Sequence, residues 1–171
     1  MAEPGWGLLV AGLALLDMNA NYCEAGCLAP REAVPRLSIS AGPIVYREDV
    51  SGGEIYVRRD TSAAFGPLGL GYGVSVATGG AVWAGAGVVH TFEIPGTQAY
   101  FQSHFMPGIY IRGNGVDIGG SVNARAGFEL GLETDRGIRV GLSVNHRSNG
   151  GLYRDNPGVD TVQVRVAFPF R

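Results

Sequence analysis

From about residue 36 onward, apolar and polar residues alternate along the chain with a period of two. In 119–133, for example, the even positions include Val122, Phe128 and Leu130, and the odd positions include Arg125 and Glu129. This is the period of a β-strand, in which successive side chains point to opposite faces. Clusters of Gly, Pro, Asn and Asp separate the alternating runs and predict turns. We therefore predict eight strands, which cover 36–47, 53–64, 68–78, 81–93, 98–112, 119–133, 137–148 and 159–170.

The length of these runs and the charges within them predict the kind of sheet. Strands of about ten residues are long enough to cross a bilayer at the tilt of a barrel. The polar face carries charges in mid-strand, such as Arg125, Arg139 and Arg165, which suit the interior of a small membrane barrel whose apolar face meets lipid. Alternation alone also fits a soluble sandwich or a lipocalin-like barrel. We favour an all-β, eight-stranded antiparallel transmembrane β-barrel over residues 36–171.

The composition excludes several other classes of protein. A length of 171 residues suits one domain, and every basic side chain is Arg. The net charge of -2 argues against a nucleic-acid partner, because no basic run is present to neutralise phosphates. The chain has no run of about 18 apolar residues, so the sequence predicts no membrane-spanning helix. We expect no metal and no other cofactor, because the two cysteines have no further ligands beside them.

Residues 1–35 precede the predicted barrel and contain an apolar run from Trp6 to Leu16 that has the length of a signal peptide. Glu3 stands where a signal peptide carries positive charge. The run is therefore either an atypical export segment or a short membrane-associated or buried segment. Cys23 and Cys27 form either a local disulfide or two free thiols.

Three polar residues interrupt the apolar rows of the last two predicted strands. His146 and Ser148 continue the even-numbered row of 137–148, and Asp160 begins the even-numbered row of 159–170. By parity, all three belong to the rows that face lipid. If the two strands pair as a hairpin, a register with His146 opposite Asp160 is available. The three side chains would then gather at one end of the barrel wall.

Such a cluster has the chemistry of a nucleophilic triad. Serine is too weakly acidic to attack unaided, histidine accepts its proton, and a carboxylate fixes the histidine tautomer. Oxyanion donors are available from the backbone of the Gly-rich turn or from Asn149 or Asn156. The alternative is structural, since a Ser and a His near a strand end often cap the ladder or face interfacial water. Polar groups on a lipid-facing row are costly, which favours the functional interpretation.

The segment from His146 to Leu152, followed by 156–160, resembles the active-site motif of the outer-membrane lipid A 3-O-deacylases of the PagL type. The shared pattern is His-x-Ser-Asn with a small residue and Gly, then an acidic residue twelve positions after the serine, here Asp160. The resemblance covers 137–171 specifically and 36–136 only as an architecture. The family usually has Glu where this chain has Asp160, and the shorter Asp must sit closer to His146.

The resemblance implies an eight-stranded barrel in the bacterial outer membrane that hydrolyses the ester-linked acyl chain at the 3 position of lipid A, at the outer leaflet and without a metal. Lipopolysaccharide and outer-membrane lipids would be its partners. It also implies roles for individual residues. These are Ser148 as nucleophile, His146 as base, Asp160 as orienting acid, and Asn149, Gly151 and Asn156 as oxyanion candidates. Arg147 and Arg154 are candidate contacts for lipid A phosphates.

Two other functions remain open at this stage. One is a structural barrel without catalysis, and the other is an esterase that acts on phospholipid. The sequence also leaves the oligomeric state open, with a homodimer as one alternative.

Overall fold

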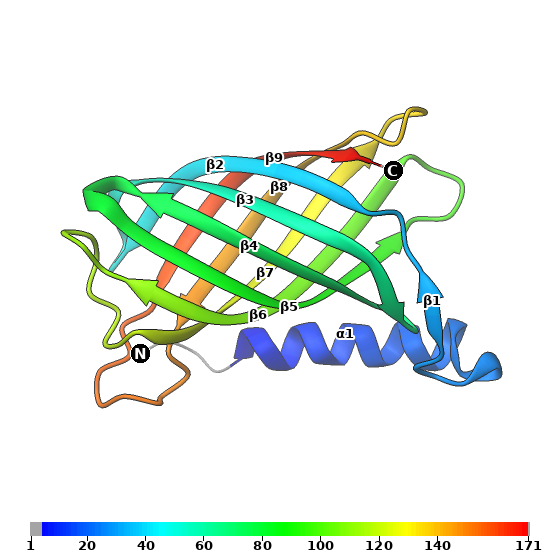
Figure 1. Cartoon of the computed structure of the whole chain (residues 1–171), viewed down its shortest axis with the longest axis horizontal. Coiled ribbons are helices and arrows are strands. Elements are labelled where there is room, and N and C mark those ends of the chain that lie inside the picture. Colours follow the sequence, from blue (N-terminus) through cyan, green and yellow to red (C-terminus); the bar gives the residue numbers. More distant parts are fainter. Residues whose placement is uncertain (1–4, 171) are drawn as a thin grey trace.

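The computed structural model describes residues 5–170, and most of them form a closed antiparallel β-barrel (Figure 1). Each of β2 to β9 pairs with its neighbours in the chain, and β9 pairs with β2 to close the ring. The predicted eight-stranded barrel is confirmed. Its strands are β2 (Arg36–Tyr46), β3 (Asp49–Phe65), β4 (Leu68–Ala77), β5 (Ala81–Glu93), β6 (Ala99–Ile111), β7 (Val122–Glu133), β8 (Arg139–Ser148) and β9 (Val159–Pro169).

Some strand bounds differ from the prediction. β3 begins at Asp49 rather than 53, because Arg47 and Glu48 take left-handed backbone angles (φ 51° and 73°) and close a two-residue turn. Such a turn usually signals itself by Asn-Gly or Asp-Gly, which this chain lacks at that point. A short strand, β1 (Pro30–Glu32), was not predicted and adds to the edge of β3.

The two faces of the barrel wall differ as the alternation predicts. Outward-facing aliphatic side chains are exposed, and that of Leu130, for example, is 60% exposed. The inward-facing row of the same strand holds Arg125 and Glu129, both buried. Surfaces of this kind, apolar outside and polar inside, belong to a barrel that stands in a membrane.

Glu54 lies at the centre of a polar network inside the barrel. Its carboxylate accepts hydrogen bonds from Arg125 (2.6 Å), Arg147 (2.9 Å), Ser75 (2.9 Å) and Gln163 (2.9 Å). Four different strands contribute these donors. The network therefore links β3 to β4, β7, β8 and β9 across the interior of the ring.

Aromatic packing fills the interior beside this network. Trp83 is fully buried and packs edge-on against Tyr56, with ring centroids 6.0 Å apart. A Cβ atom at Gly108 would come within 2.8 Å of the Trp83 indole. Glycine at this position therefore leaves room for the indole inside a narrow barrel.

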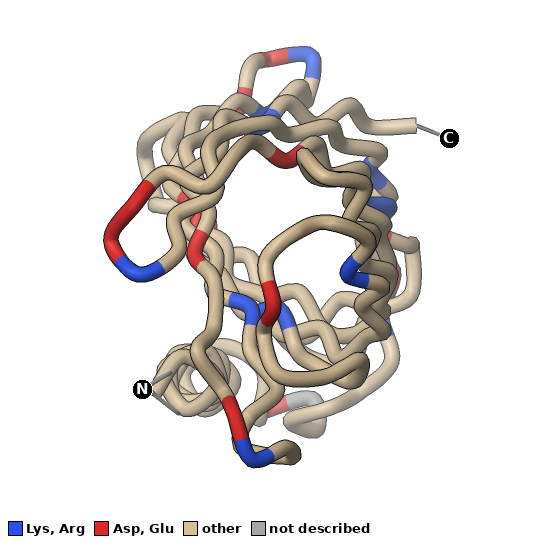
Figure 2. Tube along the Cα trace, turned by 90° about the vertical axis from the view of Figure 1, so that its left-hand side faces the viewer, with Lys and Arg blue, Asp and Glu red and all other residues tan. Residues whose placement is uncertain are grey.

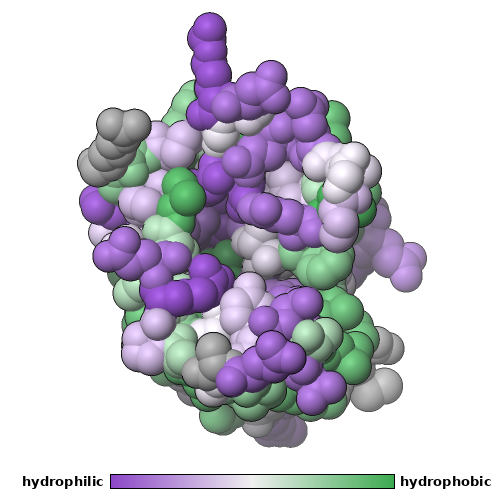
Figure 3. Space-filling view, turned by 90° about the vertical axis from the view of Figure 1, so that its right-hand side faces the viewer, coloured by the Kyte–Doolittle hydropathy of each residue, from purple (hydrophilic) through white to green (hydrophobic). Residues whose placement is uncertain are grey.

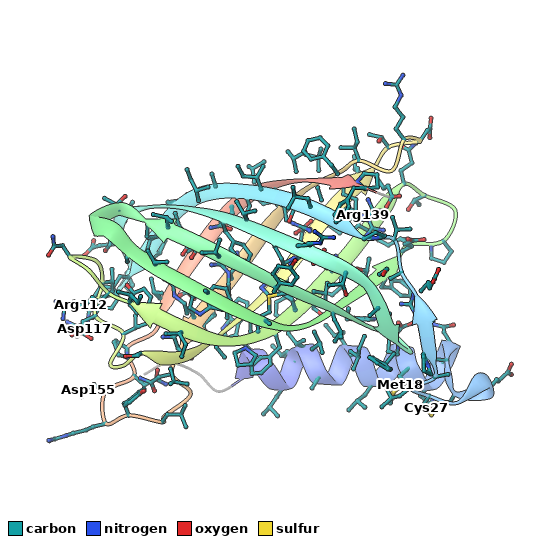
Figure 4. All side chains as sticks on the ribbon, in the orientation of Figure 1. Met18, Cys27, Arg112, Asp117, Arg139 and Asp155 are labelled. Atoms are coloured by element: carbon teal, nitrogen blue, oxygen red, sulfur yellow. A yellow bond between two sulfur atoms is a disulfide. The ribbon has the colours of Figure 1, made fainter. Side chains whose placement is uncertain are left out.

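The two ends of the barrel are built differently. At the end where the C-terminus lies, the surface is hollowed and largely hydrophilic (Figure 3). A polar cavity of about 530 Å³ is lined there by side chains that include Arg36, Asp60 and Arg139. The opposite end carries the connections 112–121 and 149–158, whose Arg112, Asp117 and Asp155 lie near one another (Figure 4).

A single long helix, α1 (Gly5–Asn21), lies outside the barrel along its wall (Figures 1 and 2). The apolar run from Trp6 to Leu16 falls within it, and it packs on β6 and β7. Within the described part of the chain, no helix has the length and apolar character needed to cross a membrane. Cys23 and Cys27 follow the helix and form a disulfide, which is one of the two alternatives that the sequence left open.

Candidate functional site

His146 and Asp160 form a hydrogen-bonded pair on the outer face of the barrel wall. The two residues are direct register partners on β8 and β9, the register that hairpin pairing made available. The His146 Nδ1 atom lies 2.7 Å from the Asp160 Oδ1 atom. His146 is only 8% exposed, whereas the Asp160 side chain is 50% exposed. The shorter carboxylate therefore does reach the imidazole, because the ladder places the two backbones opposite each other.

Ser148 continues the outer row of β8, two residues beyond His146, and is partly buried. Within residues 5–170, no hydrogen bond joins Ser148 to His146, and the buried Nε2 atom of His146 has no partner. The strand places both side chains on one face. The neighbouring strand β7 presents Ala124 and Ala126 as their register partners, so the site is flanked by small side chains.

The connection after β8 is organised by Asn149, which is almost fully buried. Its side-chain amide donates to the carbonyl oxygens of Ile118 (3.0 Å) and Asp155 (2.7 Å). Its side-chain oxygen accepts from the Gly151 N–H (2.9 Å), and its own N–H donates to the Asn156 side-chain oxygen (3.0 Å). The structure thus brings the three oxyanion candidates together, with the backbone N–H groups of Asn149 and Gly151 engaged within the connection itself.

The two arginines expected at lipid phosphates lie in different places. Arg147 points into the barrel, is 4% exposed and pairs with Glu54. The expectation of a phosphate contact is therefore wrong for Arg147, because β8 parity turns its side chain away from the lipid-facing row. Arg154 lies exposed in the 149–158 connection.

Trp6 of α1 is a neighbour of the site that the sequence did not indicate. Its indole stacks on the His146 imidazole, with ring centroids 5.7 Å apart and an angle of 13° between the planes. It also stacks on Phe128 of β7, at 5.4 Å. An aromatic residue in an apolar run gives no sign of which wall it will meet, so sequence reasoning had no means of finding this contact.

Comparison with known proteins decides the family. The profile described as lipid A 3-O-deacylase (PagL) matches residues 51–169, well over half of the chain. The chain belongs to the lipid A 3-O-deacylase family. Membership supports a lipid A deacylase, and thus an ester hydrolase, in the outer membrane. No curated protein matches the chain.

Solved structures agree with this membership at the level of the fold. The crystal structure of the outer-membrane enzyme PagL superposes with a TM-score of 0.65 at 17% identity, covering 79% of this chain and 99% of that one. Neisserial surface protein A gives a TM-score of 0.58 at 9% identity, covering 81% and 98%. A de novo designed transmembrane β-barrel gives 0.57 at 9% identity, covering 80% and 94%. At these identities the likeness shows the barrel fold alone.

The described residues of this deacylase family member offer no metal centre. Among them, no group of three or more His, Cys, Asp or Glu side chains is arranged to hold a metal ion. The polar side chains that the lipid-facing rows bring together at the site are those of Ser148, His146 and Asp160.

Proposed function

We propose that the chain is an esterase that removes the acyl chain ester-linked at the 3 position of lipid A, with Ser148, His146 and Asp160 as its catalytic triad. The observation that carries the proposal is the 2.7 Å bond between His146 and Asp160 on the lipid-facing row, with Ser148 two residues further along it. Family membership supplies the class of substrate. The position on lipid A and the roles of these residues are the proposal.

In the proposed reaction, the Ser148 Oγ atom attacks the ester carbonyl and its proton passes to the His146 Nε2 atom. Nε2 is the nitrogen without a partner, since Nδ1 is held by Asp160. The imidazolium then protonates the departing sugar oxygen, and an acyl-serine ester remains. Water, deprotonated by the same nitrogen, hydrolyses that ester and releases the fatty acid and free Ser148.

Stabilisation of the oxyanion is assigned to the connection that follows Ser148. Asn149, Gly151 and Asn156 are its candidates, and hydrogen bonds hold them close to the end of β8. In the present arrangement two of their N–H groups bond within the connection. The proposal therefore requires these groups to turn towards the reacting carbonyl when substrate binds.

The site is assigned to the outer leaflet. It lies on the lipid-facing row, at the end of the barrel that carries the connections 112–121 and 149–158. Its substrate would then enter from within the membrane rather than from water, which favours a lipid ester. Arg154, which is exposed in the same connection, is the remaining candidate for a lipid A phosphate.

The test is product analysis by mass spectrometry. Purified protein in detergent is incubated with lipopolysaccharide and, separately, with phospholipid. We expect release of a 3-hydroxy fatty acid from lipopolysaccharide alone, and we expect Ser148→Ala to abolish it. Ser143→Ala is the matched control, because Ser143 lies on the same strand but faces the interior, where it bonds to the Gln163 carbonyl.

Each other outcome contradicts part of the proposal. Full activity in Ser148→Ala would exclude the triad. Release from phospholipid alone would make the protein an esterase for that lipid. A folded wild-type barrel that cleaves neither lipid would indicate a structural role. Heat-modifiable migration on electrophoresis verifies that each variant is folded.

A further inference from the structure

An apolar groove runs between α1 and the outer wall of the barrel. It has a volume of about 400 Å³. Gly7, Ala11 and Met18 line it from the helix, and Leu68, Val88 and Phe105 line it from β4, β5 and β6. Figure 4 shows Met18 beneath this wall. All of the residues that line the groove are apolar, glycine or proline, so an occupant must itself be apolar.

The groove begins two strands away from His146, the base of the proposed reaction. Phe105, Ala126, His146 and Asp160 follow one another as register partners across β6 to β9. Two strand spacings of about 4.8 Å therefore separate Phe105 from His146, or about 10 Å. On the helix side, Gly7 lies against Phe105 and directly follows Trp6, which stacks on His146.

The length of the groove matches one layer of lipid chains. From Gly7 to Met18 the helix rises by about 16 Å, at about 1.5 Å per residue. The hydrocarbon core of a bilayer is about 30 Å thick, so one leaflet is about 15 Å deep. The helix runs away from the site towards the opposite end of the barrel (Figure 1). A chain attached at Ser148 would point along it, towards the middle of the membrane.

A buried hydrogen bond between two side chains holds the far end of α1 on the wall. The Asp17 Oδ2 atom lies 2.8 Å from the His90 Nε2 atom, with side chains only 9% and 3% exposed. Without the helix, His90 would stand on the lipid-facing row of β5 with no carboxylate beside it, which is costly in a membrane. The pair supports α1 as a lasting wall of the groove.

We propose that α1 and the outer faces of β4, β5 and β6 bind the acyl chain of the ester that the site cleaves. This inference rests on the proposed function for the identity of the ester, and it requires α1 to remain part of the folded protein. If residues 1–35 were an export segment and were cleaved, the protein would lose α1 and with it this wall of the groove.

The first experiment blocks the groove. Ala11→Phe places a ring in it, and Ala20→Phe makes the same substitution at an exposed position of α1 outside the lining. We expect Ala11→Phe to lower kcat/KM for a tetradecanoyl ester about tenfold, the loss expected when about two methylene groups no longer reach apolar contact. The loss for a butyryl ester should be smaller, so the ratio of the two kcat/KM values should fall in Ala11→Phe, whereas Ala20→Phe should keep the wild-type ratio. Identical chain-length profiles for the two variants would overturn the groove.

The second experiment measures binding without hydrolysis. Trp6 directly precedes Gly7 of the groove lining, and the other tryptophan, Trp83, is fully buried inside the barrel. A brominated fatty acid in detergent should therefore quench wild-type fluorescence saturably. Ala20→Phe should be quenched as wild type is, and Ala11→Phe should need a much higher concentration of the brominated fatty acid. Trp6→Phe should show no saturable quenching.

These readouts separate the two proposals. Saturable quenching without hydrolysis of any lipid would leave the groove in place and overturn the proposed function. Hydrolysis of lipid A with equal quenching in Ala11→Phe and Ala20→Phe would support the proposed function and overturn the groove. An intact mass of the membrane-isolated protein that lacks residues 5–21 would also overturn the groove.

Discussion

Glu54 and Asp160 are two carboxylates on neighbouring parts of the same barrel wall, yet their surroundings differ. Glu54 faces inward, is 2% exposed and accepts bonds from two arginines, a serine and a glutamine. Asp160 faces outward, is half-exposed and bonds to a single imidazole. A carboxylate that accepts four hydrogen bonds links several strands, whereas a carboxylate with one partner orients that partner, and the other His146 nitrogen has no hydrogen bond.

The strongest test of this contrast compares the outer and inner histidines. His146→Ala should lower deacylation roughly 10⁶-fold, because the attacking serine loses its base, while heat-modifiable migration verifies that the variant barrel is folded. His104, which lies inside the barrel 3.4 Å from Arg58, is the matched position. His104→Ala should leave deacylation within about tenfold of wild type. Equal losses of activity in both variants would contradict the assignment of the base.

Asp160→Asn tests the orienting role. The amide keeps the size of the side chain but removes the charge that steadies the imidazolium, so deacylation should fall by about 10⁴-fold. Stability should change little, because the Asp160 carboxylate is half-exposed and the amide can keep a hydrogen bond to the imidazole. The measurement is single-turnover release of fatty acid beside thermal unfolding. A variant that is fully active would remove Asp160 from the site.

Glu54→Ala should have the opposite effect, a loss of folding stability rather than a direct loss of catalysis. It leaves Arg125 and Arg147 buried without their shared carboxylate, which costs about 3 to 5 kcal/mol of folding free energy. Refolding in urea with detergent, followed by the heat-modifiable shift, measures that loss. Glu48→Ala is a suitable control, since Glu48 lies exposed in the turn between β2 and β3. Wild-type stability in Glu54→Ala would show that the inner network does not hold the ring closed.

Asp160→Glu should have the smallest effect. The longer side chain restores the residue that the family usually carries, and the His146 ring has room to adjust because the carboxylate is half-exposed. Deacylation should stay within about tenfold of wild type. A larger loss, measured by the same release assay, would show that the site is fitted to the shorter acid.

The barrel could be predicted because the pattern that specifies each strand lies within that strand's own sequence. A period of two fixes which side chains face lipid, and the same parity assigns His146, Ser148 and Asp160 to the lipid-facing rows of their strands. Their register follows from the hairpin. The connection from residue 149 onward was less predictable, because the bonds of Asn149 to Ile118 and Asp155 depend on a second connection far away in the sequence.

Other features had no local signal. The turn at Arg47 and Glu48 uses residues that rarely take positive φ, so the predicted start of β3 was wrong. The phosphate contact of Arg147 was wrong for a different reason, since strand parity directs this side chain into the barrel even though a loop begins close by. The position of Trp6 on His146 depends on how α1 docks, which neither periodicity nor composition encodes.

The pairing of His146 with Asp160 across a ladder has a consequence for how the family can vary. The distance between the two backbones is set by strand pairing, and their register can shift only in steps of whole residues. Side chains there can lengthen or shorten, as between Glu and Asp, while the strands stay in place. Insertion or deletion of one residue within β8 would instead turn Ser148 and His146 into the interior. Lineages should therefore exchange Asp and Glu at position 160, yet almost never gain or lose a residue within β8.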